Sequence, residues 1–268
     1  MSAINYLFDT IMRPFRFSHP IVPLALISAL TGIVLLLVYR FASDQKAIRR
    51  SKDKLEAHLL EVRLFQEQLR AVLRAYPRLF LGILNYLRHS LRPLMIMAIP
   101  LLILLVQLEG FFGWKPNRVG AEFLVKARVT DSAALDQLEL RIPRGISLTA
   151  PPLHIPEENE VDWRITAEQP GEYSLAVFVQ GGTFSKSVSV SNQLVRLSPR
   201  RLRGNWLDRV LHPAEPQLPR NGGLASIEVQ YPSRNFYLWG YALDWLLVFL
   251  ALSLIAGFAL KGIFGVQI

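Results

Sequence analysis

The feature that most constrains this chain is an uncharged apolar run from Ile21 to Tyr39, IVPLALISALTGIVLLLVY. A helix needs about 20 such residues to cross the hydrocarbon core of a bilayer, so residues 20–40 are predicted to form a first transmembrane helix. A cleavable signal peptide is the alternative, because Arg13 and Arg16 precede the run. The run exceeds the roughly 7–15 residues of a typical signal h-region and no small-x-small site follows, so we expect it to be retained.

Two further runs are predicted to span the membrane. Residues 91–114 have an uncharged middle between Arg92 and Glu109 and contain two prolines, which membrane helices tolerate. Residues 236–260 open on an aromatic cluster and are followed by Lys261, with Asp244 as their only charge. Aromatic and basic ends are typical of helices that pass between two membrane interfaces.

The distribution of charge predicts the topology. The net charge is +9, and Lys and Arg gather between Arg40 and Arg92, directly after the first span. This positive-inside pattern places residues 41–90 and the tail 261–268 in the cytoplasm, and the N-terminus and the long loop after residue 114 outside. The predicted location is a prokaryotic inner (cytoplasmic) membrane. The chain has no cysteine, which excludes disulfides and thiolate metal sites.

The segments beside the first span are predicted to be helical. Residues 1–19 carry apolar side chains at helical spacing next to Arg13 and Arg16, which predicts an interfacial amphipathic helix, with a disordered tail as the alternative. Residues 41–90 contain a long stretch without Gly or Pro, then Tyr76-Pro77, then an amphipathic return. We therefore expect a coiled-coil arm that ends at Tyr76-Pro77 and a second helix leading to the membrane.

After residue 114 the hydrophobic pattern changes to period two, which predicts an all-β domain. Residues 115–200 contain short alternating segments separated by Gly and Pro, typical of a β-sandwich. Trp163 and Tyr173 resemble the core tryptophan and tyrosine corner of immunoglobulin-like domains. Residues 201–235 are predicted to hold a short helix over Leu202 to Leu211, a Pro-rich linker and a last strand, ASIEVQY.

The fold class is thus an α-helical membrane protein with three transmembrane helices, a cytoplasmic helical hairpin and an extracytoplasmic immunoglobulin-like sandwich. No phosphate loop, nucleophile elbow or dinucleotide fingerprint occurs, and the histidines lie singly on different segments. The acidic run Glu157, Glu158 and Glu160 is interpreted as a solvated turn. We therefore expect no enzyme activity, no cofactor and no metal site.

Two sets of polar residues are candidates for function. Gln107, Glu109 and Asp244 lie on the extracytoplasmic side of the second and third spans, where they would line a hydrated groove or, alternatively, reach lipid headgroups. The basic residues at the cytoplasmic side are Arg49, Arg50, Lys52, Lys54 and Arg92. The cluster in the arm would contact ribosomal RNA or a nascent chain, although topology and anionic lipid explain it equally well, and Arg92 would by default snorkel to lipid phosphates. We expect no DNA binding.

Three segments carry a resemblance to a known family: the arm SDQKAIRRSKDKLEAHLLEVRLFQEQLR, the entry LRPLMIMAIPLLILL and the closing DWLLVFLALSLIAGFALKGIFGV. Their arrangement resembles the insertase superfamily that includes the bacterial YidC insertase and the mitochondrial Oxa insertase. It implies a non-enzymatic factor that helps hydrophobic segments into the membrane through a hydrophilic groove. Small relatives do not typically carry a sandwich before the last span, so binding outside the membrane is expected to matter here.

Three functional hypotheses follow. The first is an insertase-like biogenesis factor or scaffold, whose partners are lipid and client membrane proteins, with ribosome contact as a further expectation. The second is a structural or accessory subunit of a larger membrane complex, in which the spans pack against other subunits. The third is a receptor whose β domain binds a ligand.

Overall fold

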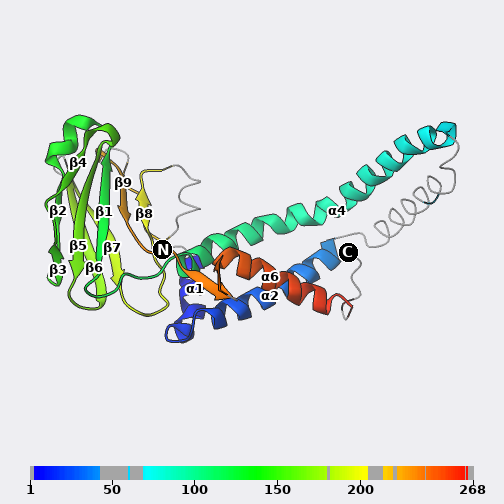
Figure 1. The fold of residues 1–268 in the computed structure, drawn as a ribbon, viewed down its shortest axis with the longest axis horizontal. Helices are drawn as coiled ribbons and strands as arrows, with labels where there is room; N and C mark the ends of the chain where they lie inside the picture. Colours follow the sequence, from blue (N-terminus) through cyan, green and yellow to red (C-terminus); the bar gives the residue numbers. More distant parts are fainter. Residues whose placement is uncertain are drawn as a thin grey trace. The chain divides into compact units, whose positions relative to one another are not determined.

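The structure is a computed structural model, and it describes residues 3–42, 60, 69–179, 182–204, 214–219, 222–238, 240–262 and 264 (Figure 1). The chain divides into two compact units. The first comprises residues 1–24 and 103–245, and the second comprises residues 25–102 and 246–268.

Antiparallel sheets dominate the first unit. The larger sheet has the order β3-β5-β1-β9-β8, with β4 also paired to β5, and the smaller sheet has the order β2-β6-β7. The strands have the following bounds: β1 Glu122–Val129, β2 Glu139–Arg141, β3 Ile146–Leu148, β4 Leu153–Ile155, β5 Glu160–Ala167, β6 Gly171–Val179, β7 Gly182–Val190, β8 Arg200–Leu202 and β9 Leu224–Val229. Two short 3-10 helices, η2 Ser132–Gln137 and η3 Pro156–Glu158, connect strands.

Both sheets contribute to one hydrophobic core. Every second residue of β1 points inward, as the alternation in its sequence predicts, and Val125 and Ala127 are fully buried. Trp163 of β5 packs in the same core as Leu175 and Val177 of β6. The two sheets therefore face each other across a shared apolar layer, which is the arrangement that aligned β-sheets use to bury one face each.

The β domain differs from the sequence prediction at its boundaries. The alternating pattern LDQLELRI predicts a strand from Leu135, but β2 begins only at Glu139, because the preceding residues form η2. The β domain also extends beyond its predicted end at residue 200, because β9 is hydrogen-bonded between β1 and β8 in the larger sheet. Leu202, expected to open a short helix, belongs to β8, and residues 205–213 lie outside the described residues.

Four α-helices are described. These are α1 Ala3–Met12, which is followed by the 3-10 helix η1 Arg13–Phe15, and α2 Ile21–Ala42, α4 Leu69–Phe112 and α6 Trp245–Leu260. Two stretches are long and apolar enough to cross a membrane, Ile21–Phe41 in α2 and Leu94–Phe112 in α4. The helix predicted at the N-terminus is confirmed, while its place at a membrane interface stays a prediction.

The prediction of a helix break at Tyr76-Pro77 was wrong. The described part of α4 continues through Pro77, Pro93 and Pro100 for 44 residues. A proline removes one amide donor and crowds one carbonyl, which commonly bends a helix rather than ending it when the residues on both sides favour helix. Most of the predicted arm, residues 43–59 and 61–68, lies outside the described residues.

The third predicted span is also corrected. Its first part is a β-hairpin, formed by β10 Asn235–Leu238 and β11 Tyr241–Asp244, and the helix α6 begins only at Trp245. The cause is visible in the composition, because the aromatic residues of FYLWGYALD favour strand and Gly240 adopts a positive φ of 85° between the two strands. At 16 residues, α6 is shorter than the two other apolar stretches.

Candidate functional site

The predicted groove residues have three different surroundings. Gln107 is buried and accepts a hydrogen bond from Arg196, with 2.8 Å between Arg196 Nη1 and Gln107 Oε1. Glu109 is exposed and lines a pocket. It follows Gln107 by two residues, which is about 200° around the helix, so the two side chains point in nearly opposite directions. Asp244 is the exposed last residue of β11 and does not lie two turns into a helix as predicted. The pocket that Glu109 lines includes neither Gln107 nor Asp244.

The basic candidates fall largely on parts that are not described. Arg49, Arg50, Lys52 and Lys54 lie outside the described residues. Arg92 belongs to the backbone of α4, and its side chain lies outside what the structure describes. Their contact with RNA or lipid stays a prediction.

Arg196 joins three parts of the first unit. Its Nε donates to Asp9 Oδ1 at 2.8 Å, which adds a salt bridge to the contact with Gln107. Its guanidinium carbon lies 4.7 Å from the centroid of the Phe111 ring, a distance that permits a cation–π interaction. The planar fork of one arginine therefore holds the loop after β7, the helix α1 and the end of α4 together.

Backbone hydrogen bonds reinforce this junction. The Leu197 amide donates to the Gly110 carbonyl of α4 at 2.8 Å, and the Leu194 amide donates to the Arg16 carbonyl at 2.9 Å. A Cβ on Gly110 would lie 3.3 Å from Arg196 Cγ, so glycine allows the close approach. We call Arg196, Asp9, Gln107 and these backbone contacts the Arg196 junction.

The Arg196 junction gives α1 an unusual orientation. Asn5 is fully buried and Asp9 is bound to Arg196, whereas Ile4, Leu7 and Ile11 are 44%, 56% and 46% exposed. A surface helix of a water-soluble domain normally turns its apolar stripe toward the core and its polar face outward. In α1 the polar Asn5 and Asp9 face the protein together with the apolar Met12, whereas Ile4, Leu7 and Ile11 face away from it.

Replacing Arg196 by alanine is expected to release α1. The change leaves the buried amide of Gln107 without its donor, which costs about 1–3 kcal/mol. Hydrogen exchange of the full chain should then show faster exchange in residues 3–16, and Arg196→Lys should recover only part of the protection because lysine lacks the fork. Arg203→Ala, which removes an exposed arginine bound to Thr130, is the control. Unchanged exchange in α1 for Arg196→Ala would contradict the assignment.

A pocket of about 360 Å³ lies next to the Arg196 junction. Glu109 of α4 and Glu228 of β9 both line it, together with Trp114 and Tyr231. Glu228 is already paired with Arg200, with 2.9 Å between Oε2 and Nε. Within the described residues no group of three or more His, Asp or Glu side chains is placed to hold a metal ion.

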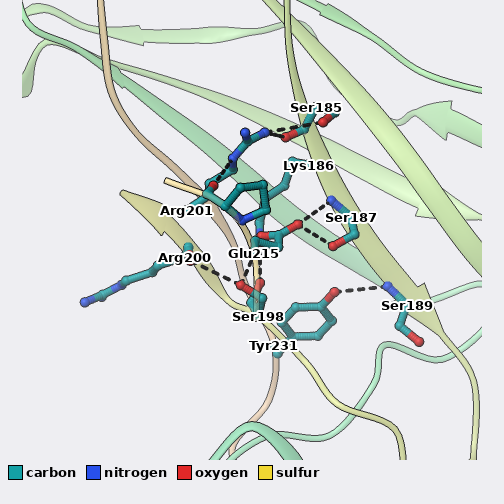
Figure 2. Close-up of polar contacts among 10 residues, drawn as sticks. Ser185, Lys186, Ser187, Ser189, Ser198, Arg200, Arg201, Glu215 and Tyr231 are labelled. Carbon is teal, nitrogen blue, oxygen red and sulfur yellow. Dashed lines mark hydrogen bonds and ion pairs between the residues drawn. The ribbon is translucent and has the colours of Figure 1, made fainter. Parts of the chain in front are cut away.

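Several polar groups of the β domain gather around the buried side chain of Lys186 (Figure 2). Lys186 of β7 is fully buried and its ammonium contacts the carboxylate of Glu215 and the backbone carbonyl of Ser198. Glu215 also accepts from the Ser187 amide at 2.9 Å and from the Ser187 hydroxyl. Burial alone would raise the pKa of Glu215, but Lys186 and Ser187 bring it below its ordinary value. Burial lowers the pKa of the Lys186 ammonium, and the carboxylate of Glu215 opposes this shift.

This cluster closes the outer edge of the smaller sheet. Three backbone amides on the side of β7 that faces away from β6 are occupied. The Ser187 amide donates to Glu215, and the Ser189 amide donates to the Tyr231 hydroxyl at 3.1 Å. Directly after the strand, the Ser191 amide donates to the Asn117 carbonyl at 3.1 Å. The Ser185 carbonyl accepts from Arg201 (Figure 2). An edge strand whose hydrogen-bonding groups are occupied cannot pair with another chain. We call these contacts the Lys186 edge cap and interpret them as structural.

The acidic run is only partly the solvated turn predicted. Glu158 in η3 is exposed, but Glu160 lies in β5 and is 6% exposed. Glu160 and Asp162 flank Lys126 of β1, with 3.0 Å and 3.3 Å between carboxylate oxygen and ammonium nitrogen. Burial raises the pKa of Asp162 above its ordinary value. Asp162 was not a candidate, although its place two residues after Glu160 in an alternating strand puts both on one face.

Small residues bring α2 and α6 together in the second unit. A Cβ on Gly32 would overlap the carbonyl oxygen of Ser253 and lie 3.0 Å from its carbonyl carbon. A Cβ on Gly257 would lie 3.6 Å from the Gly32 carbonyl oxygen. Ser28 and Gly32 are four residues apart on α2, as are Ser253 and Gly257 on α6, and both pairs match the small-xxx-small pattern of close helix pairs. We call these four residues the small-residue seam.

Comparison with known proteins adds no relative. No protein-family model, no curated protein and no solved structure matches this chain.

Proposed function

We propose that this protein is a non-enzymatic scaffold of the cytoplasmic membrane, anchored by α2, the second half of α4 and α6, with its β domain on the extracytoplasmic side. The clustered Lys and Arg after the first span support that orientation. In this proposal the β domain is the binding part and the helices are the anchor.

One observation carries the membrane assignment. The helices of the second unit expose large apolar side chains in rows, and α2 and α6 approach each other closely at small residues. Leu26, Leu30 and Val34 of α2, spaced four apart, are 56%, 62% and 47% exposed. Met95 and Ile99 of α4 are 71% and 66% exposed. Water disfavours contiguous apolar surface of this kind, whereas lipid does not, and helices in lipid associate through small residues.

Two aromatic residues support an immunoglobulin-like β domain within this proposal. Trp163 is 2% exposed in the core between the sheets. Tyr173, directly after the turn that opens β6, donates from its hydroxyl to the Gln169 carbonyl at 2.7 Å. This return to the backbone a few residues upstream is the hydrogen bond of a tyrosine corner. Domains of this architecture commonly bind proteins through their loops.

An insertase-like role is the second candidate, and the length of α4 favours it. The described helix rises about 66 Å at about 1.5 Å per residue, roughly twice the thickness of a hydrocarbon core. Its residues before Leu94 therefore continue beyond the apolar stretch, as the arm of the insertase superfamily does. Against it, the buried polar residues described in the second unit are the small Ser28, Thr31 and Ser253, which do not form a charged groove.

In-cell photo-crosslinking separates these candidates. A crosslinking residue is placed singly at Leu84 and Ile99 of α4, which are 47% and 66% exposed, and at Leu254 of α6, which is 58% exposed. A scaffold subunit should give one or two discrete partners at fixed stoichiometry. A smear of many newly made membrane proteins would instead support the insertase-like role and overturn the scaffold. A position on the β domain, Leu148 at 44% exposure, serves as the control for crosslinking outside the membrane.

A further inference from the structure

The hairpin β10–β11 is exposed in an unusual way. Its four register pairs run from Asn235↔Asp244 to Leu238↔Tyr241, and it pairs with no third strand among the described residues. Tyr237, Leu238 and Tyr241 near its tip are 74%, 51% and 74% exposed. A two-stranded hairpin alone is marginally stable in water, so these apolar residues need a surface to cover them.

The helix that follows indicates which surface this is. The apolar helix α6 starts at Trp245, directly after the hairpin, and its 16 residues rise about 24 Å. A hydrocarbon core is about 30 Å thick, so α6 alone falls short by about 6 Å. The hairpin is joined to α6 without a linker and carries the residue types that gather at membrane–water interfaces, tyrosine foremost.

We propose that the β10–β11 hairpin is an interfacial anchor that lies in the headgroup region of the bilayer, with Tyr237 and Tyr241 at the boundary between headgroups and acyl chains. The occupant of the exposed aromatic surface is lipid. This inference rests on the proposed membrane location and adds that the β-hairpin anchors the extracytoplasmic end of the short helix α6 at the interface.

The attachment of the hairpin to the β domain fits this role. Phe236 is 9% exposed and Arg234, just before the hairpin, is 8% exposed, so the base is held inside the first unit. The Arg234 amide donates to the Gly113 carbonyl at 3.0 Å, and its Nε donates to the Trp114 carbonyl at 3.1 Å. The hairpin is thus fixed next to the end of the apolar stretch Leu94–Phe112. Its base is rigid protein and its tip is apolar surface.

The test uses the absence of cysteine in the chain. Single cysteines at Tyr237, Tyr241, Leu254 and Leu148 of the full chain are labelled with an environment-sensitive fluorophore after reconstitution into phosphatidylcholine vesicles containing anionic lipid. Quenching is measured with aqueous iodide and with lipids that carry a nitroxide at the headgroup or deep in the acyl chain. Tyr237→Cys and Tyr241→Cys should be quenched most by the headgroup nitroxide and several-fold less by iodide than Leu148→Cys on strand β3.

Two outcomes overturn the proposal. If Leu254→Cys on α6 is quenched by the deep nitroxide while Tyr237→Cys and Tyr241→Cys are quenched by iodide as strongly as Leu148→Cys, α6 is in the membrane and the hairpin is in water. If the probe at Leu254→Cys is quenched by iodide and by neither nitroxide, α6 is in water and the proposed membrane location is wrong. A control with Tyr237→Ser and Tyr241→Ser in the Leu254→Cys chain should shift the α6 probe toward shallower quenching, because the aromatic anchors are lost.

Discussion

Replacing Glu215 by glutamine is expected to lower the free energy of unfolding of the β domain by about 3–5 kcal/mol, because it leaves a buried charge without its counter-ion. Lys186 is fully buried, and Glu215 is its only carboxylate partner among the described ion pairs. The same carboxylate holds the Ser187 amide and hydroxyl, so the substitution also weakens the Lys186 edge cap. Chemical denaturation of the full chain in detergent, followed by hydrogen exchange in β6 and β7, measures the loss.

A matched substitution tests whether the loss of stability comes from the burial of the ion pair. Glu228→Gln removes the carboxylate that pairs with Arg200. The side chain of Glu228 is 34% exposed and that of Arg200 is 57% exposed, and surface pairs of this kind contribute about 0–1 kcal/mol. Lys186→Met combined with Glu215→Leu should recover most of the stability, since apolar residues replace a buried pair with little loss. Equal, small effects of Glu215→Gln and Glu228→Gln would show that the buried pair does not hold the domain.

The same carboxylate gives the pH dependence a sign. The pKa of Glu215 lies below its ordinary value in the folded domain, so its contribution to stability is present above the pKa of the unfolded chain. The contribution is lost as pH falls from the ordinary value near 4.5 through the lower folded pKa. The stability of the wild-type domain should therefore decline in that window, and Glu215→Gln should remove this part of the decline.

The buried lysine was partly visible in the sequence. The alternation of TFSKSVSVS puts Phe184, Lys186 and Val188 on the inward face of one strand, and a lysine in such a position calls for a buried partner. Its partner was not visible, because Glu215 stands in a Pro-rich segment without periodicity. The same limit applies to the Arg196 junction, in which the contacts to Asp9 and Gln107 join residues 187 and 89 positions apart.

Local patterns predicted the fold where one period was strong. The apolar helix α2, most β-strands and the apolar end of α4 follow directly from hydrophobic runs and alternation. The prediction failed between residues 236 and 244, where an apolar run has no period and the length of the whole segment favoured helix over hairpin. It also failed at Pro77, because a proline signals a helix end that neighbouring residues overrode. The small-residue seam could not be predicted from the sequence. Ser and Gly in an apolar helix show where a close contact is permitted, but they do not show which helix makes it.

Replacing Gly32 by alanine, and more so by leucine, is expected to push α2 and α6 apart. The added Cβ would overlap the Ser253 carbonyl oxygen, and a backbone atom inside a helix cannot move aside as a side chain can. Overpacking of a tight contact costs about 1–3 kcal/mol, and here the whole helix must shift. The full chain in detergent should lose thermal stability, measured as the fraction that stays monodisperse after heating, and Gly32→Leu should lose more than Gly32→Ala.

Gly257→Ala is the matched control for the small-residue seam. Its Cβ would lie 3.6 Å from the Gly32 carbonyl oxygen, an ordinary van der Waals distance, so the change should leave thermal stability close to that of the wild type. Glycine-to-alanine substitution favours helix in both positions, and only the contact differs between them. A drop for Gly32→Ala but not for Gly257→Ala therefore assigns the effect to the approach of α2 to Ser253. If Gly32→Ala is as stable as the wild type, the two helices do not meet at this residue and other contacts must hold the second unit together.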